Sequence, residues 1–312
     1  MRFISMMLMV TLAVAQTPPP AAAPAPAKVK PPRVPKPGIP GLAKPIETVK
    51  PDFVFAVEGT PDWLVASDDA MWVSAIRSTK VARMNPKTGK VDALIELGGG
   101  PCSGLAYGFG SIWVPLCKEN QLARIDIKKN EVVARIPYGP PQSEGLLTTT
   151  KDSVWMLTGK EGKTLLRIDP DTNKPVAEIA VAEGSYAVMA GEGAVWVTSH
   201  KKNLVSRVDP LSNLVTHEIE VGEEPRFLTV GEGFVWTLNQ KKGNVSKIDP
   251  KLNKVVATIE VGVPGGGGEI SAGDGSVWVT QFEFPVSRID PEANKVTHQY
   301  AGPGGDSIKV GH

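Results

Sequence analysis

The chain has 312 residues, with 34 Lys and Arg against 33 Asp and Glu and a formal net charge of +1. This balance gives no reason to expect a nucleic-acid partner, because such binders usually carry a clear basic excess. Hydrophobic residues make up 41% of the chain, and the 32 Gly and 28 Pro are typical of a globular protein with many short strands and tight turns.

The first 15 residues have the pattern of a secretory signal peptide. Arg2 gives a positive start, residues 3–14 are almost entirely apolar, and Ala13-Val14-Ala15 fits a small-x-small cleavage site. The alternative is a membrane anchor, but the apolar run is shorter than the roughly 18 residues needed to cross a bilayer. We therefore expect a secreted or periplasmic protein with no transmembrane span in its mature chain.

Residues 16–51 are rich in Pro, Ala and Lys. Prolines such as Pro18-Pro19-Pro20 favour extended polyproline conformations and lack the N–H donors that a sheet needs. This segment is predicted to be a semi-rigid linker. Its basic residues leave contact with an anionic cell envelope as the alternative to a simple solvated tether.

Six tryptophans mark an internal repeat through the rest of the chain. They are separated by 41, 42, 41, 40 and 42 residues, and each lies in a short apolar strand. These residues are Trp72, Trp113, Trp155, Trp196, Trp236 and Trp278. Each unit also has an apolar strand before the Trp strand, a basic-apolar-acidic strand after it such as Arg207-Val208-Asp209, and a fourth strand such as 255–259.

Four short antiparallel strands in each unit of about 40 residues predict an all-β fold, a β-propeller over residues 52–312. One four-stranded unit cannot bury both of its faces, whereas units stacked around an axis can. The Trp side chains are therefore expected in the core between blades. In most units an Asp-Pro pair and a later Asn, such as Asn173 or Asn213, predict a tight turn before the fourth strand.

Two fragments at the ends of the repeat region predict a partial seventh blade. Residues 53–57 resemble a fourth strand, and residues 306–311 resemble a first strand. Gly311 matches Gly231 and Gly273, which each precede a Trp by five residues. The sequence predicts six complete repeats and a seventh blade without its middle strands, so the chain is either C-terminally truncated or forms an imperfectly closed ring.

The two cysteines, Cys102 and Cys117, fall on opposite strands of the second unit. The hairpin centre is predicted between Phe109 and Gly110, which places the cysteines roughly opposite each other and within disulfide range. Export would allow this bond to persist. A disulfide is the prediction, with a pair of free thiols as the alternative.

The repeat resembles the YVTN-type and virginiamycin B lyase-like (streptogramin lyase) propeller repeats. The resemblance depends on the Gly-x-Gly-x-Val-Trp-Val pattern at 191–197, a related pattern at 273–279, the Arg-Ile-Asp-Pro strand and the Ile-x-Val-Gly ending at 219–222. It covers residues 53–311 and implies a propeller fold. It also implies the activity of a metal-assisted lyase that uses His and Glu near the loops joining the blades. No His-plus-Glu set of this chain matches that pattern.

Propeller ligands usually meet the mouth of the central channel, so we expect the site in two sets of loops there. Loops that lead into the first strands offer Asp62, Trp63, Ser103, Glu144, Tyr186, Arg226, Glu269 and Asp306. Loops that leave the Trp strands offer Arg77, His200, Asn239 and Gln281. Four scattered His residues predict no metal site, and residues 265–268 are expected to form a flexible glycine loop at the mouth.

The sequence supports two functions of different classes. The first is a non-catalytic propeller that binds an unknown small molecule or protein at the channel mouth, with no catalytic residues and no cofactor. The alternative is a metal-assisted lyase of the virginiamycin B lyase type, and Mg²⁺ is expected only in that case. A structural part of a cell-envelope complex is a third hypothesis.

Overall fold

A computed structural model describes residues 38–140 and 144–311. The predicted signal peptide at 1–15 and residues 16–37 of the predicted linker lie outside the described residues. No helix in the described part of the chain is long and apolar enough to cross a membrane.

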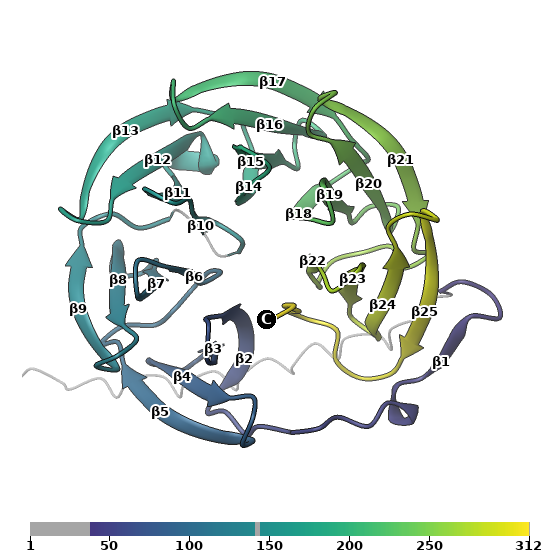
Figure 1. Ribbon diagram of the computed structural model, residues 1–312, viewed down its shortest axis with the longest axis horizontal. Helices are drawn as coiled ribbons and strands as arrows, with labels where there is room; N and C mark the ends of the chain where they lie inside the picture. Colours follow the sequence, from purple (N-terminus) through teal and green to yellow (C-terminus); the bar gives the residue numbers. More distant parts are fainter. Residues whose placement is uncertain (1–37, 141–143, 312) are drawn as a thin grey trace, which may run out of the picture. The chain divides into compact units, whose positions relative to one another are not determined.

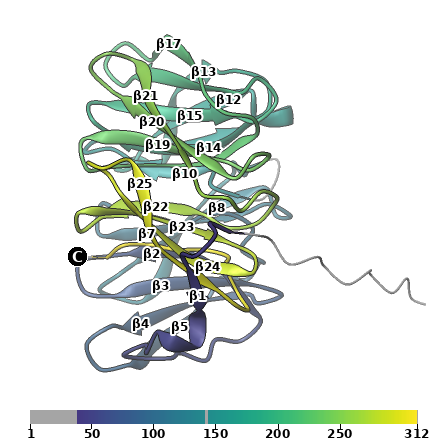
Figure 2. The ribbon, with the colours of Figure 1, turned by 90° about the vertical axis from the view of Figure 1, so that its right-hand side faces the viewer.

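Six four-stranded antiparallel sheets are arranged as blades around a central channel (Figures 1 and 2). The innermost strands, nearest the channel, are β2 (Thr60–Ala66), β6 (Ala106–Gly108), β10 (Leu147–Thr149), β14 (Ser185–Gly191), β18 (Pro225–Gly231) and β22 (Ile270–Gly273). The Trp strands follow as β3 (Met71–Ile76), β7 (Ser111–Leu116), β11 (Val154–Thr158), β15 (Ala194–Ser199), β19 (Phe234–Asn239) and β23 (Ser276–Gln281).

The two outer positions of each blade complete the repeat. The third strands are β4 (Lys80–Asn85), β8 (Gln121–Asp126), β12 (Thr164–Asp169), β16 (Leu204–Asp209), β20 (Asn244–Asp249) and β24 (Phe284–Asp290). The outermost strands are β5 (Lys90–Glu96), β9 (Glu131–Ile136), β13 (Lys174–Ala180), β17 (Leu214–Glu220), β21 (Lys254–Glu260) and β25 (Lys295–Ala301). Two short 3-10 turns, η1 (Ile46–Thr48) and η2 (Lys160–Gly162), are the only helical segments in the described residues. The predicted β-propeller is therefore confirmed.

The core lies between neighbouring blades, as the repeat predicts. The Trp of each of the first five blades is fully buried against the next blade; Trp72, for example, packs with Ile112 and Ile125. Trp278, in the sixth blade, is only half-buried. Burial of a large aromatic side chain is among the strongest contributions to a protein core, so these contacts hold the blades together.

A partial seventh blade is not part of the observed sheets, which number six in the described residues. Residues 53–57 and 306–311 form no strand, because no middle strands lie between them to complete a hydrogen-bonded ladder. Phe55 and Val57 instead pack against Val73 and Met84 of the first blade.

The predicted linker also differs from expectation at one point. Residues 43–45 form β1 (Ala43–Pro45), which pairs in parallel with the outer strand β25. Pro45 is compatible with this position because an edge strand leaves one side of its backbone unpaired. The sixth sheet therefore has five strands.

The disulfide between Cys102 and Cys117 is present, with their Cα atoms 5.8 Å apart. Strand β6 pairs with β7 so that Gly108 lies opposite Ser111, which centres the hairpin between Phe109 and Gly110 as predicted. The bond joins the loop that enters the second blade to the end of its Trp strand.

Candidate functional site

The two ends of the channel are built from different loops. One end carries the tight turns within each blade, and we call it the turn face. The other end carries the loops that join one blade to the next and those that follow the Trp strands, and we call it the mouth face. The predicted site residues lie in these mouth-face loops or in the strand ends next to them.

On the turn face, carboxylates and cations make structural contacts that recur from blade to blade. The Asp169 carboxylate accepts a hydrogen bond from the Asp171 amide at 2.8 Å, and Asn173 adopts a left-handed φ of 57°, as the turn pattern predicts. Arg167 lies 5.1 Å from the centre of the Trp155 ring and donates to the Pro210 carbonyl of the next blade at 2.7 Å. Such contacts repeat between blades and stabilise their stacking.

On the mouth face, five predicted residues line one cavity of about 480 Å³. They are Asp62, Glu144, Tyr186, Arg226 and Asp306. Trp63 and Glu269 line a second cavity of about 440 Å³ along the channel, and Phe227 lines both cavities. Residues that lie more than 200 positions apart in the sequence therefore meet around the mouth.

Asp62 and Asp306 form a carboxyl pair in the mouth cavity. Asp62 is 8% exposed, and burial together with its hydrogen bond to Asp306 and the repulsion between the two raises its pKa to about 8. Burial also raises the pKa of Asp306. Two carboxyls this close cannot both ionise easily, so the pair retains a proton near neutral pH.

Glu144 adds a third carboxyl to this cavity. Burial is the main cause of its raised pKa, and Asp306 and Glu269 add repulsion, while the Trp63 indole and Arg226 offset part of the rise. The backbone of Glu144 has a φ of 95°, a conformation that side-chain-bearing residues rarely adopt. Strained backbone of this kind is concentrated at functional sites.

An aromatic and basic cluster faces these carboxyls. The Arg226 guanidinium lies 4.8 Å from the centre of the Tyr186 ring, and Phe227 meets the same ring edge-on at 5.9 Å. Burial, followed by repulsion from Glu144, raises the pKa of the Tyr186 hydroxyl. His200 packs edge-on against Tyr186 at 5.3 Å, and burial lowers its pKa.

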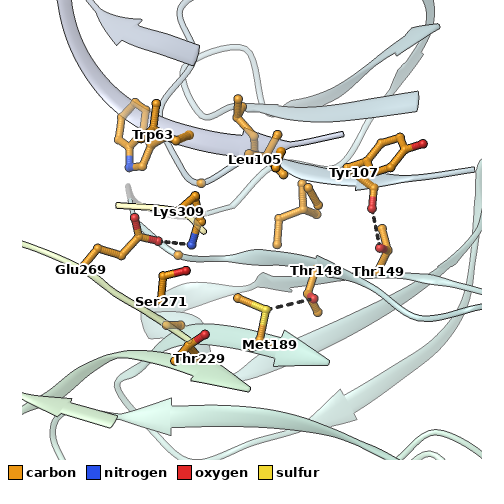
Figure 3. Close-up of a pocket in the computed structure, with 18 of the residues that line it drawn as sticks. Trp63, Leu105, Tyr107, Thr148, Thr149, Met189, Thr229, Glu269, Ser271 and Lys309 are labelled. Carbon is orange, nitrogen blue, oxygen red and sulfur yellow. Dashed lines mark hydrogen bonds and ion pairs between the residues drawn. The ribbon is translucent and has the colours of Figure 1, made fainter. Parts of the chain in front are cut away.

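In the channel below, Glu269 is paired with Lys309 (Figure 3). Both side chains are largely buried, at 16% and 19% exposed respectively. The second Glu269 oxygen accepts a hydrogen bond from the Ile308 amide at 3.2 Å. The carboxylate of Glu269 is therefore balanced by a positive charge, unlike the carboxyls of the mouth cavity.

Several predicted site residues line neither of these cavities. Asn239 is fully buried and donates to Asn244 at 3.0 Å and Ser246 at 2.8 Å, which are structural contacts within its blade. Gln281 is 1% exposed. Arg77 and His200 also lie outside the cavity linings, although the His200 ring packs edge-on against Tyr186, which lines the mouth cavity.

The mouth cavity also contains residues that sequence reasoning did not select. Glu224, Gln240 and Phe282 line it. Ser103, which was predicted, lines neither cavity but donates to the Glu144 carbonyl at 2.7 Å. Gln240 directly follows Asn239 and Glu224 lies two residues before Arg226, so a wider window around each chosen position could have found them. Residues 266–268 of the glycine loop also line the cavity, at the place where the loop was expected.

The described residues do not provide a set of three or more His, Cys, Asp and Glu side chains placed to hold a metal ion. The metal that the lyase alternative requires therefore has no matching ligand set in residues 38–140 and 144–311. No chemical step through a metal is derived from this site.

Six four-stranded blades around a channel with a polar mouth define the chain as a β-propeller. Among solved structures it is similar to a streptogramin B lyase, at 16% identity, with 83% of this chain and 90% of that chain covered and a TM-score of 0.69. It is also similar to virginiamycin B lyase from Staphylococcus aureus, at 19% identity, 82% and 90% coverage and a TM-score of 0.69.

The same fold relates this chain to propellers of other classes. The WD40 repeats of RRP9 are similar at 10% identity, with 82% of this chain and 86% of that chain covered and a TM-score of 0.70. No protein-family model and no curated protein matches the sequence. The resemblance to the virginiamycin B lyase fold is thus confirmed, and at these identities it shows the fold alone.

Proposed function

We propose that this chain is an exported β-propeller that binds a small polar molecule, or a short segment of a partner protein, at the mouth of its central channel without catalysing a reaction. The observation that supports the proposal most directly is the meeting of Asp62, from strand β2, with Glu144 and Asp306, from two separate loops, around one cavity. Buried carboxyls with raised pKa values are unfavourable for stability alone, which favours a functional reason for their presence.

The proposed location outside the cytoplasm is supported by the disulfide between Cys102 and Cys117. Such bonds persist in oxidising compartments and are rare in reducing ones. The signal pattern at 1–15 and the basic linker agree with export, and the linker would place the propeller near the cell envelope.

We further propose that residues 306–311 take the place of the innermost strand of a seventh blade. The Val310 amide donates to the Ser271 hydroxyl at 3.0 Å, just as the Ala272 amide donates to the Thr229 hydroxyl at 3.2 Å one blade earlier. Gly311 in turn lies against Ala66 of the first blade. This arrangement would explain how Asp306 comes to face Asp62.

A thermal-shift screen with a library of polar small molecules tests the binding proposal. Compounds that bind the native state raise the unfolding temperature, and the rise increases with the logarithm of their concentration above the dissociation constant. Hits should stabilise the wild-type protein and lose their effect in a Glu144→Gln/Arg226→Gln variant, while an Asp169→Asn variant on the turn face keeps the response.

The outcome decides between the functions. Compounds that stabilise all three proteins equally, or no stabilising compound at all, would contradict a site at the mouth. Cleavage of a stabilising compound during incubation with Mg²⁺ would favour the lyase alternative over the non-catalytic function.

A further inference from the structure

The mouth cavity has an excess of acidic groups that nothing in its lining balances. Four carboxyl side chains line it, and Arg226 is the single cationic side chain among the described lining residues. These carboxyls are Asp62, Glu144, Glu224 and Asp306. By contrast, Glu269 in the adjoining channel cavity has Lys309 as its partner.

The unbalanced carboxyls are poorly solvated. Asp62 is 8% exposed, and the raised pKa values of Asp62, Glu144 and Asp306 follow chiefly from their burial. A positive charge brought among them would allow them to ionise, because an opposite charge within a few ångströms favours the charged form. The cavity is therefore electrostatically complementary to a cation.

A second observation comes from Trp63, which lies where the two cavities adjoin. Its side chain is 6% exposed, and among the described residues its buried indole Nε1–H makes no hydrogen bond of good geometry. The indole lies close enough to the Glu144 carboxyl to help lower its pKa, so its N–H is only weakly satisfied there. Figure 3 shows the indole nitrogen on the side of the ring that faces Glu269 and Lys309 across the channel cavity.

A buried N–H without an acceptor is costly, and a ligand oxygen placed there would remove the cost. The Glu269 carboxylate is held by Lys309 and by the Ile308 amide, and it accepts no hydrogen bond from the indole. A well-placed acceptor for Trp63 can come from a bound molecule.

The size and lining of the cavity favour an organic cation over a metal ion. No three acidic or His side chains of the described residues are placed to hold a metal, whereas a cavity of about 480 Å³ has room for an organic group. Tyr186, Phe227 and Phe282 also line it, and aromatic faces attract organic cations.

From these contacts we infer, building on the proposed mouth site, that the ligand is an organic amine or guanidinium compound with a hydrogen-bond acceptor oxygen. Its positive group lies among Asp62, Glu144 and Asp306, and its oxygen accepts from the Trp63 indole. The peptide amino terminus, basic side chains next to carbonyl groups, and amino alcohols all belong to this chemical class.

Three matched probes test the inference: L-lysinamide, cadaverine and hexanamide. Cadaverine has the two amines of lysinamide without its carboxamide, and hexanamide has the carboxamide without the amines. Binding is followed by NMR shifts of mouth-face amides in the wild-type protein. We expect lysinamide to bind roughly tenfold or more tightly than hexanamide, as for a charged hydrogen bond worth about 1.5 kcal/mol.

Two variants then test which side chain binds the amines of lysinamide and which binds its carboxamide. Glu144→Gln should weaken lysinamide and cadaverine together, whereas Trp63→Phe should abolish the advantage of lysinamide over cadaverine and leave cadaverine unchanged. Asp169→Asn, on the turn face, is the control and should change neither affinity.

Hexanamide binding as tightly as lysinamide would overturn the inference while leaving a binding site at the mouth in place. Absence of binding by all three probes would also overturn it, because the amine class would then be excluded. The thermal-shift screen tests the proposed function independently of this inference. Neutral or acidic compounds that bind at the mouth would support a site there for a different class of ligand.

Discussion

Carboxyl side chains have pKa shifts of opposite direction on the turn face and on the mouth face of the propeller. On the turn face, backbone amides hydrogen-bond Asp126, Asp169, Asp209 and Asp290 and lower their pKa values. On the mouth face, burial and mutual repulsion raise the pKa values of Asp62, Glu144 and Asp306.

The difference separates residues that build the fold from residues that form the site. Each turn-face carboxylate stabilises a turn that recurs from blade to blade, so its position follows from the repeat. On the mouth face, Asp62 lies in strand β2 and Glu144 and Asp306 lie in loops, and their carboxyls do not stabilise a recurring turn. Groups that a fold does not need, yet holds at a cost, are the ones that a ligand can use.

The largest expected effect comes from the covalent link on the mouth face. A Cys102→Ser/Cys117→Ser variant opens a loop of 15 residues, and the loss of this constraint should lower the free energy of unfolding by about 3 kcal/mol in the chain-entropy account. Chemical denaturation of the variant and the wild type measures the change. Equal stabilities would show that the second blade holds the mouth loops without the disulfide.

A smaller loss is expected on the turn face from Arg167→Ala. This change removes the stacking on Trp155 and the hydrogen bonds to the Pro210 carbonyl and to the Asn213 side chain at 3.0 Å. We expect a loss of about 2 kcal/mol by denaturation, because buried hydrogen bonds from charged groups contribute about that much.

Arg288→Ala is the matched control for that variant. Arg288 stacks on Trp278 at 5.4 Å and donates to the Ser276 hydroxyl at 2.8 Å, but within the described residues it makes no hydrogen bond to the turn of a following blade. Its replacement should cost less than that of Arg167. Equal losses would mean that stacking on the Trp ring, and not the contact between blades, provides the stability.

A third comparison distinguishes the two faces by the direction in which stability changes with pH. The pKa of Asp62 rises from 3.8 in the unfolded chain to about 8 in the folded protein, so the folded state holds an extra proton between these values. Its contribution to stability is present in full below about pH 4 and is lost as the pH rises toward 8. The unfolding temperature of the wild type should therefore fall over this range, and Asp62→Asn should flatten the fall by a few degrees.

The turn-face counterpart is Asp169→Ala. The pKa of Asp169 is lowered by its backbone hydrogen bonds, so its stabilisation is present above pH 4 and is lost only at lower pH. This variant should lower the unfolding temperature by a constant amount between pH 5 and pH 8.5. If the unfolding temperature of Asp62→Asn fell with rising pH as steeply as that of the wild type, the contrast between the two faces would be contradicted.

Much of the fold could be predicted because the repeat fixes it. The spacing of the tryptophans gave the blades, and the hairpin centre at 109–110 gave the disulfide. Strand β1 could not be predicted, since three residues pairing in parallel at a sheet edge leave no periodic pattern in the sequence. The half-burial of Trp278 likewise depends on what lies beside the sixth blade and not on the repeat itself.

The site was predictable in part for the same reason. Loops that join blades lie at one end of the channel, so Asp62, Glu144 and Asp306 could be brought together from the repeat alone. Asn239 and Gln281 end their Trp strands, and the local register turns both side chains into the blade instead of the channel. A sequence pattern does not fix the direction of these two side chains, because that direction depends on packing against neighbouring strands.

The central claim is that the environment of the mouth face raises the pKa values of its carboxyls. An NMR titration of the side-chain carboxyl carbons measures these pKa values directly. The account predicts that Asp62 titrates near pH 8 and that Asp306 and Glu144 also titrate above their ordinary values, while Asp169 titrates below its own. Titration of all four carboxyls between about pH 3 and pH 5, as in unfolded peptides, would contradict it.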